Sequence, residues 1–302
     1  MTSARSSRLI VPPFLELGEP IGIATPASPY DREPFEAGLT ILRQWGYSPQ
    51  LGRRGIRKKR YLAGSDSERA EELMDLFQDP AIKAILCARG GYGAMRLLPL
   101  LNYREINKNP KLLIGFSDIT VLLLSLWKKA RLMTFHGPMV TTLARLTAAS
   151  RDQFRFTLRG VLPESLSLPR SGRINGGQAQ GILVGGNLTL LTHLIGTPFE
   201  PDWSRAILFL EDEGEQGYRL DRLFVHLRLS GVLEQIKGLL LGQFNGKGIM
   251  KKDFEVIRET FAGLEIPIRQ GLPVGHGREN LTLPIGAPVH LDGDQGLLRF
   301  PW

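Results

Sequence analysis

The chain has 302 residues, of which 42% are hydrophobic and 23% are charged, and its formal net charge is +8. These proportions are ordinary for a globular protein, and the length allows two domains with sizeable cores. The single cysteine, Cys87, excludes a framework of intramolecular disulfides and is typical of a reducing compartment. It lies in the apolar run AILCA, which favours a buried packing residue over a reactive thiol.

The N-terminal segment makes a poor signal sequence, because its short apolar stretch is broken by Pro12 and Pro13. No stretch approaches the ~18 uninterrupted apolar residues of a membrane span, so we expect a cytoplasmic protein without a membrane partner. Much of the positive charge lies in RRGIRKKR, residues 53–60, which is typical of a solvated loop. Because aromatic residues are not interleaved with it, we expect no nucleic-acid partner. Attraction of small anionic substrates stays open.

The first half of the chain alternates between apolar runs and helical patterns, which predicts a parallel sheet covered on both faces. Asp31 is an expected cap of the first helix, and Ser65 and Glu68 have capping-box spacing at the start of the second. In chain order, the expected elements are a strand over 21–27, a helix over 31–47, a helix over 65–79, a strand over 81–88, a helix over 90–101 and a strand over 111–116.

The composition changes after about residue 140. Residues 146–178 are mixed and rich in polar residues, glycine and proline, as a linker would be. Beyond them, apolar strands alternate with helices expected at about 187–195, 218–230 and 253–264, and the chain closes with a hairpin around Asp292-Gly293-Asp294. We therefore expect an N-terminal α/β domain over 1–145, a linker over 146–178 and a C-terminal α+β domain over 179–302.

Two loops follow predicted strands at the edge of the sheet where ligands bind in open α/β folds. One is ARGGYG, in which Gly90, Gly91 and Gly93 let backbone approach a ligand closely. Such a loop could hold a phosphate, line an oxyanion hole or make a tight turn. The other is GFSD, which contains Ser117. This serine is either a helix cap or the nucleophile of a strand-to-helix elbow, although Ile119 stands where the elbow's second glycine would be.

The five histidines show no metal-ligand spacing, and the chain has no H-E-x-x-H motif and no cysteine cluster, so we expect no metal and no cofactor. His193 and His226 occur in amphipathic helical contexts, where packing or solvated positions are usual, and His290 lies in the terminal hairpin. His136 ends an apolar stretch near the expected active face, where it would support other residues. His276 lies between two glycines in PVGHGREN, which leaves its imidazole accessible.

Acidic residues follow the apolar strand AILFL in the stretch LEDEGE. Glu211 and Asp212 come directly after the strand, so one of them is expected at its end. A dense acidic run is usually a solvated turn. A carboxylate that leaves a buried strand is nevertheless well placed to hold an imidazole.

With these residues assembled, the sequence resembles the murein LD-carboxypeptidases, a serine peptidase family. In that family the serine of G-F-S-D is the nucleophile, which implies this role for Ser117. The first acidic residue of L-E-D is the triad glutamate, here Glu211, and the histidine of G-H-G is the base, here His276. The resemblance covers nearly the whole chain, in the blocks IGIATPAS, RYLAGSDSERAEELMDLF, ARGGYGAMRLLPLL, LIGFSDIT, FHGP, VGGNLTLLTHLIGTP, LEDEGE, GYRLDR and PVGHG.

The resemblance also implies a flavodoxin-like N-terminal domain, a β-rich C-terminal domain, an active site between them and a homodimer. The backbone N–H of Asp118, beside the nucleophile at a helix start, is the natural oxyanion donor, and Gly90 or Gly91 would supply a second. A carboxypeptidase must bind a free carboxylate, and Arg89 or Arg278 is expected to do so.

The activity implied is release of terminal D-Ala from a cytoplasmic murein tetrapeptide during peptidoglycan recycling, so the expected partner is a small peptide substrate. The sequence is also similar to a sister branch, the microcin-immunity peptidases, which cleave peptidyl or aminoacyl adenylates. There Tyr92 or Trp203 would stack on adenine. A more distant alternative is a flavodoxin-like binding module, in which the glycine-rich loop holds a phosphate or nucleotide and Ser117 is only a cap.

Overall fold

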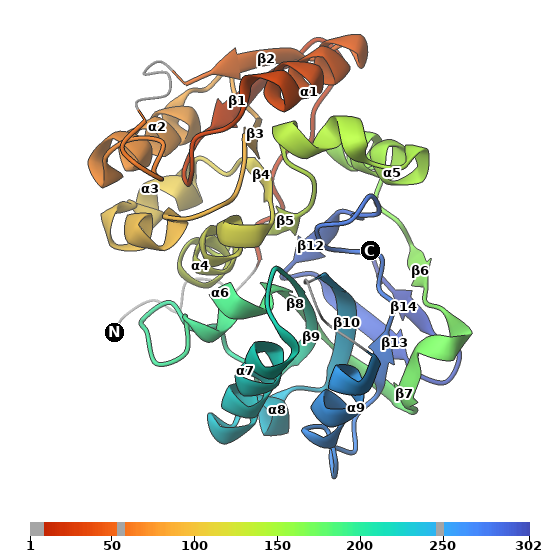
Figure 1. The fold of residues 1–302 in the computed structure, drawn as a ribbon. Helices are drawn as coiled ribbons and strands as arrows, with labels where there is room; N and C mark the ends of the chain where they lie inside the picture. The colour runs from red at the N-terminus through yellow and green to blue at the C-terminus, as the bar shows by residue number, and fades with distance from the viewer. Residues whose placement is uncertain (1–8, 53–57, 246–250) are drawn as a thin grey trace, which may run out of the picture.

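The computed structural model describes residues 9–52, 58–245 and 251–302, and it contains two sheets (Figure 1). The six-stranded sheet and its helices form the upper part of Figure 1, and the eight-stranded sheet forms the lower part. Most of the basic run expected as a loop, residues 53–57, lies outside the described residues, as do residues 1–8 of the N-terminal segment.

The six-stranded sheet has the strand order β12-β5-β4-β3-β1-β2. Five of its strands are parallel, and β12 pairs antiparallel with β5 at one edge. The parallel order 2-1-3-4-5 is that of flavodoxin-like folds, so the predicted fold class is confirmed. The strands are β1 (Pro20–Ala24), β2 (Ser48–Leu51), β3 (Ala84–Cys87), β4 (Leu112–Gly115), β5 (Thr134–His136) and β12 (Leu283–Ile285).

Helices cover both faces of this sheet. One face packs against α1, η3 and α5, and the other against α2, η1 and α4, where η denotes a 3-10 helix. The α-helices are α1 (Arg32–Gln44), α2 (Asp66–Gln78), α3 (Tyr103–Lys108), α4 (Thr120–Ala130) and α5 (Ala148–Leu158). The 3-10 helices are η1 (Ala94–Leu100), η2 (Ser117–Ile119) and η3 (Val140–Arg145).

Local sequence signals explain most helix starts in this half. The capping box predicted for α2 is confirmed, because Ser65 accepts from the Glu68 N–H and the Glu68 side chain accepts from the Ser65 N–H. Asp31 occupies the N-cap position of α1, but its side chain makes no cap hydrogen bond, so that expectation is wrong. The helix expected over 90–101 is only the 3-10 turn η1, because Gly93 adopts a left-handed φ of 116° and delays its start.

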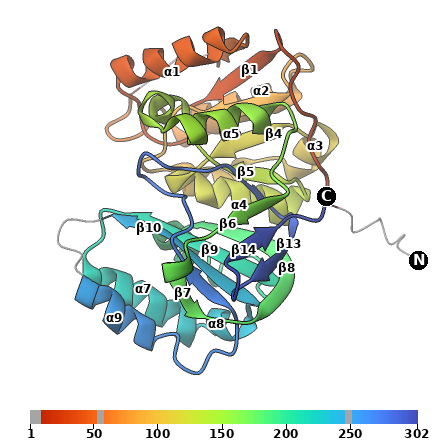
Figure 2. The same ribbon diagram turned by 90° about the vertical axis from the view of Figure 1, so that its right-hand side faces the viewer.

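The eight-stranded sheet has the order β6-β14-β13-β8-β9-β10-β11-β7, with β8 to β11 parallel in its centre. Figure 2 shows α7, α8 and α9 grouped in the lower part of the molecule beside this sheet. The strands are β6 (Ser165–Ser167), β7 (Arg173–Asn175), β8 (Gln178–Asn187), β9 (Ala206–Glu213), β10 (Gly238–Asn245), β11 (Ile268–Gln270), β13 (Pro288–Asp292) and β14 (Leu297–Arg299). The helices are η4 (Arg170–Gly172), α6 (Leu188–Thr192), α7 (Gly217–Leu229), α8 (Val232–Gln235) and α9 (Lys251–Glu259).

Two segments cross the boundary between the sheets. The stretch expected as a linker, 146–178, contains α5, whose Phe154 and Leu158 are fully buried in the core with β1, β3 and β4. From the C-terminal half, β12 leaves its neighbours and extends the first sheet beside β5. The domain limits at residues 145 and 179 therefore remain a proposal.

The helix α4 is apolar on nearly all sides, and its leucines join one buried cluster with β8, β9 and α6. Burial of the two sheets against this shared helix explains why VLLLSLW carries no polar face. Cys87 is fully buried, and burial raises the pKa of its thiol, as expected for a packing residue. Within the ranges that the structure describes, no helix has the length and apolar character needed to cross a membrane.

Candidate active site

Ser117 is separated from the end of β4 by one residue and has a φ of 62°, the left-handed region that costs a residue with a side chain about 1–2 kcal/mol. It begins η2, and η2 has no side-chain cap hydrogen bond at its N-cap, Phe116. The cap alternative for Ser117 therefore has no support in this geometry. Between residues 111 and 126, Ser117 alone is partly exposed, so the strained turn presents its hydroxyl at the end of an otherwise buried strand and helix.

Ile119 stands where the elbow's second glycine would be, and the first glycine, Gly115, leaves room for its side chain. A Cβ built on Gly115 would lie 2.8 Å from Cγ2 of Ile119, so the isoleucine side chain occupies the space that the glycine leaves. The neighbouring Asp118 points back into the protein, where its Oδ2 accepts a hydrogen bond of 2.8 Å from the Ala94 N–H. Burial raises the pKa of this carboxyl against the opposing effects of that N–H and of Arg69. The elbow is thereby tied to the glycine-rich loop.

The glycine-rich loop lies against the nucleophile candidate. A Cβ on Gly90 would lie 3.0 Å from Cβ and 3.2 Å from Oγ of Ser117. Gly91 has a left-handed φ of 108°, which a residue with a side chain rarely adopts. The buried Arg69 holds the loop by donating from Nη1 to the Gly93 carbonyl at 2.9 Å and to the Pro26 carbonyl. The loop at Gly90 therefore lies beside the Ser117 side chain, and Gly91 lies against Ser28.

His276 and Glu211 come together although 65 residues separate them in the chain. Nδ1 of His276 lies 2.8 Å from Oε2 of Glu211, whose side chain is fully buried. Burial alone would lower the pKa of His276, but the hydrogen bond and charge of Glu211, with the charges of Glu213 and Asp212, raise it above its ordinary value. A buried carboxylate on Nδ1 fixes the tautomer that leaves Nε2 free to accept a proton.

Asp212, the other candidate at the strand end, has a different set of partners. Its Oδ1 accepts from Nδ2 of Asn187 at 3.1 Å, and its Oδ2 accepts from the N–H and hydroxyl of Thr189 at 2.8 and 2.7 Å. Adjacent residues of a strand point to opposite faces, so only one of the two carboxylates can reach the imidazole. Asp212 anchors the turn from β8 into α6, and Glu211 holds His276.

The loop that carries His276 is held from both sides. Gly275 donates its N–H to Oδ1 of Asn280 at 3.2 Å, and Gly277 donates to Oε1 of Gln243 at 2.8 Å. The ring of Phe116 lies edge-on to the His276 ring, with 4.8 Å between the centroids. The imidazole is therefore placed by backbone contacts as well as by Glu211.

The other histidines do not reach the site surface. His136 is fully buried behind Phe116, and burial, with the proximity of His276, lowers its pKa to about 3. It is neutral at physiological pH and lies in a supporting position. His193 and His226 are exposed on or beside α6 and α7. Among the described residues, no group of three or more His, Cys, Asp or Glu side chains could hold a metal ion.

A cavity of about 330 Å³ opens at this point, and Ser117, His276, Gly90, Gly91 and Arg89 all line it. Three further charged residues line the cavity, Asp31, Arg145 and Glu213, and sequence reasoning gave none of them a role in the site. The sequence predicts Asp31 only as a helix cap, and Glu213 lies in the acidic stretch LEDEGE beside Glu211.

Two residues expected to bind substrate, Arg278 and Tyr92, are not among those that line the cavity. Arg278 is exposed and donates from Nε to the Arg145 carbonyl at 3.3 Å, and Tyr92 is 53% exposed and packs edge-on against Tyr61. Trp203 is buried and donates to Glu200, so it cannot be the aromatic platform considered for adenine.

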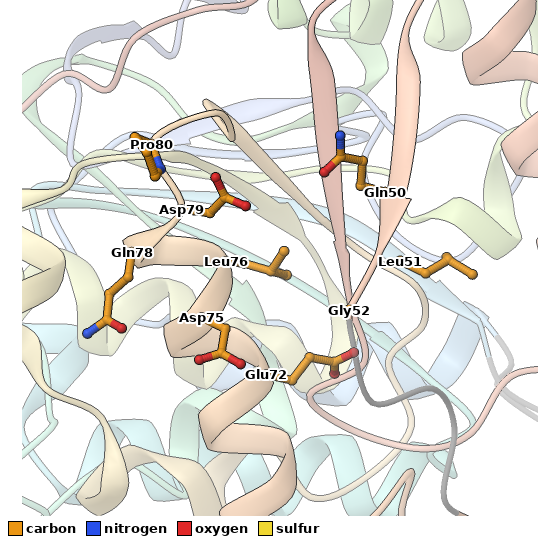
Figure 3. A pocket seen from close by; sticks show the side chains of 9 residues that line it. All are labelled: Gln50, Leu51, Gly52, Glu72, Asp75, Leu76, Gln78, Asp79 and Pro80. Atoms are coloured by element: carbon orange, nitrogen blue, oxygen red, sulfur yellow. The ribbon is translucent and has the colours of Figure 1, made fainter.

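A second cavity, of about 360 Å³, lies between β2 and α2 and contains acidic side chains (Figure 3). Glu72 is engaged there, because its carboxylate accepts from the N–H and the hydroxyl of Thr25. Asp79 accepts from the Ala81 N–H at 2.9 Å. These contacts stabilise the turns around β1 and α2. Glu72 and Asp79 therefore have a structural explanation, and no catalytic role is needed for either.

Comparison with known proteins identifies the family of the chain. Residues 21–137 match the family model of the LD-carboxypeptidase N-terminal domain, and residues 180–291 match that of the LD-carboxypeptidase C-terminal domain. A probable murein peptide carboxypeptidase of Bacillus subtilis is 36% identical over 292 residues, which cover 93% of this chain and 91% of the relative.

Two solved structures share the whole fold. A muramoyltetrapeptide carboxypeptidase from Oxalobacter formigenes has a TM-score of 0.82 and 30% identity, covering 92% of this chain and 97% of its own. The microcin C7 self-immunity protein MccF, in complex with aspartyl sulfamoyl adenosine, has a TM-score of 0.87 and 27% identity, covering 97% and 98% of the two chains. The chain therefore belongs to the LD-carboxypeptidase family and is a serine-type peptidase.

Proposed function

We propose that this peptidase is a carboxypeptidase that hydrolyses the bond between an L-centre and terminal D-Ala in murein tetrapeptides, with Ser117 as nucleophile, His276 as base and Glu211 as its partner. The observation that carries the proposal is the 2.8 Å contact between the buried Glu211 and His276, because His276 lines the same cavity as the strained Ser117. A hydroxyl, an imidazole and a carboxylate in this order are the parts of a nucleophilic triad.

In the first step, Nε2 of His276 takes the proton from Oγ of Ser117 as the oxygen attacks the peptide carbonyl. Glu211 stabilises the imidazolium that forms. The carbonyl oxygen becomes an oxyanion, for which the N–H of Asp118 and an N–H of Gly90 or Gly91 are the proposed donors. The closeness of Gly90 to Ser117 supports this part, since one such donor contributes about 100-fold or more in rate.

In the second half, His276 gives its proton to the amine of D-Ala as the C–N bond breaks, which leaves the tripeptide as an ester on Ser117. Water then attacks this ester with His276 as base, and the proton returns to Oγ as the tripeptide acid leaves. Specificity for a C-terminal residue requires a cation for its carboxylate. Arg89 and Arg145 line the cavity and are the proposed cations, whereas Arg278 lies outside it.

Cleavage of peptidyl or aminoacyl adenylates is the second candidate, and the similarity to MccF favours it. An adenine ring needs a stacking partner, but Trp203 is buried and Tyr92 lies outside the cavity. The lack of a stacking partner supports the tetrapeptide proposal over the adenylate. The two arginines of the cavity suit the free carboxylate of a tetrapeptide and the phosphate of an adenylate alike, so they do not separate the two candidates.

The test compares three substrates with the wild-type enzyme: a tetrapeptide ending in D-Ala, the same peptide ending in L-Ala, and a peptidyl adenylate. Release of alanine is followed by chromatography for the first two and release of AMP for the third. We expect turnover of the D-Ala peptide only. Turnover of the adenylate alone would replace the proposal with the second candidate.

The cytoplasmic location and the homodimer belong to the same proposal. Tetrapeptides recovered from the wall are processed in the cytoplasm in the recycling role proposed here, and cell fractionation tests this location. Light scattering on the purified protein tests the dimer, and a mass equal to that of one chain would contradict the proposed dimer.

A further inference from the structure

Two carboxylates that line the cavity, those of Asp31 and Glu213, have no part in the triad, and Glu213 contacts the base. Glu213 lies two residues after Glu211 on β9, so its side chain leaves the strand on the same face. Its Oε2 lies 3.7 Å from Nε2 of His276, the ring nitrogen opposite the one that contacts Glu211. Glu211 is fully buried, whereas 48% of the Glu213 side chain is exposed, and Glu213 lines the cavity beside the reacting atoms.

The separation of 3.7 Å is too long for a hydrogen bond, so Glu213 does not orient the imidazole as Glu211 does. It nevertheless places a negative charge next to the nitrogen that must take the Ser117 proton. A charge that faces an open cavity is available to a ligand, and the ligand chemistry that it suits is a cation.

We propose that Glu213 binds an ammonium group on the acyl half of the substrate, and so selects tetrapeptides whose third residue is a diamino acid with a free side-chain amine. This inference rests on the proposed function and deepens it. Arg89 and Arg145 take the carboxylate of the leaving D-Ala, and Glu213 takes the positive charge on the other side of the cleaved bond. The cavity then matches both charges of such a substrate.

The distances allow this contact. The reacting carbonyl carbon must come within about 3–3.5 Å of Oγ of Ser117, and Nε2 of His276 must lie within about 3.2 Å of the same oxygen. Glu213 is 3.7 Å from Nε2 and is therefore within a side chain's length of the reacting centre. In a lysine- or diaminopimelate-type residue the amine lies about five bonds, each roughly 1.5 Å long, from Cα.

Binding of an ammonium group at Glu213 would also change the pKa of the base, His276. The charges that act on the pKa of His276 are those of Glu211 and Glu213 and, from the opposite face of β9, Asp212, and neutral His136 on β5 lies near the ring. In the free enzyme the charge of Glu213 contributes to the raised pKa of His276. An ammonium group that neutralises this charge lowers the pKa of His276 in the complex. The base is then unprotonated at lower pH once the correct substrate is bound.

The experiment measures kcat/KM for two tetrapeptides that end in D-Ala and differ only at the third residue, L-lysine or L-norleucine, which keeps the carbon chain and lacks the amine. The enzymes are the wild type, Glu213→Gln and the matched control Glu215→Gln, whose carboxylate belongs to the same turn but contacts Arg219. We expect the wild type and the control to prefer lysine by about 10- to 100-fold, the range for a hydrogen bond between charged groups. In Glu213→Gln we expect this preference to fall to within about 3-fold. The fall should come only from a lower kcat/KM for the lysine peptide, with kcat/KM for the norleucine peptide unchanged.

The pH profile gives a second readout that a structural role would not move. For the wild type with lysine, the acidic limb of kcat should lie at lower pH than that of kcat/KM, and with norleucine the two limbs should coincide. Equal kcat/KM for both peptides in the wild type, or an unchanged preference in Glu213→Gln, overturns the inference and leaves the proposed function standing. If the wild type cleaves neither peptide, the proposed function fails and the inference falls with it.

Discussion

The two halves of the site are built by different means. The N-terminal half, around Ser117, is defined by backbone: a left-handed serine and glycines with no room for a Cβ. The C-terminal half, around His276, is defined by side chains: Glu211 on the imidazole, and Asn280 and Gln243 on its loop. Substitutions in the first half should act through steric fit and strain. Substitutions in the second half should act through the orientation and the pKa of one histidine.

The side-chain half gives the largest expected effect. Glu211→Gln should lower kcat by about 10⁴-fold with little change in folding, because the amide no longer fixes the tautomer or stabilises the imidazolium. Asp212→Asn is the matched control on the adjacent residue, and it should keep kcat within about 10-fold while it loosens the Asn187 and Thr189 contacts. Steady-state kinetics and circular dichroism check both. A larger kcat loss in Asp212→Asn than in Glu211→Gln would reverse the assignment.

The backbone half should tolerate a methyl group poorly. In Gly90→Ala the new Cβ would lie 3.0 Å from Cβ of Ser117, which forces the loop away, and we expect kcat to fall by about 100-fold through a displaced oxyanion donor. Gly196→Ala is the control. Gly196 has a left-handed φ of 76° with nothing within 4 Å of its Cβ position, so the substitution should lower stability and leave kcat unchanged. Unchanged kcat in Gly90→Ala would separate this loop from the reaction.

Loss of a side chain that supports the His276 loop should have a moderate effect on kcat and on stability. Asn280 is buried, and Asn280→Ala leaves the Gly275 N–H without its acceptor, which costs about 1–3 kcal/mol of stability. We expect kcat to fall about 10-fold at unchanged KM, because the imidazole is less well placed. Chemical unfolding and kinetics measured together test this. Lost stability with full kcat would make Asn280 purely structural.

The smallest expected effect concerns strain at the nucleophile. Ser117→Gly and Ser117→Ala both remove the hydroxyl, but only glycine adopts a φ of 62° without strain. The glycine variant should therefore be about 1 kcal/mol more stable than the alanine variant in denaturant unfolding. Equal stability of the two would mean that the elbow relaxes when its hydroxyl is absent.

Alternation of apolar runs and helical patterns predicts the parallel sheet, and the loops that follow its strands indicate where Ser117 and the glycines lie. Residue spacing alone does not separate Glu211 from Asp212, since both lie at the end of β9 and only the pleat distinguishes them, and the prediction of Glu211 depends on the family resemblance. Arg145 was not predicted, because it reaches the cavity from a segment that carries no other site residue. Strand alternation from Glu211 would have indicated Glu213, which lies two residues further along β9. The position of β12 depends on tertiary pairing with β5, and no local signal indicates it.

The most direct test of the whole account is the initial rate of D-Ala release from a purified murein tetrapeptide by the wild type and by Ser117→Ala. The account predicts release by the wild type and a rate at least about 10⁴-fold lower for the variant, which retains only binding and the oxyanion donors. A folded Ser117→Ala protein that releases D-Ala at a rate near that of the wild type would contradict the assignment of Ser117 as nucleophile.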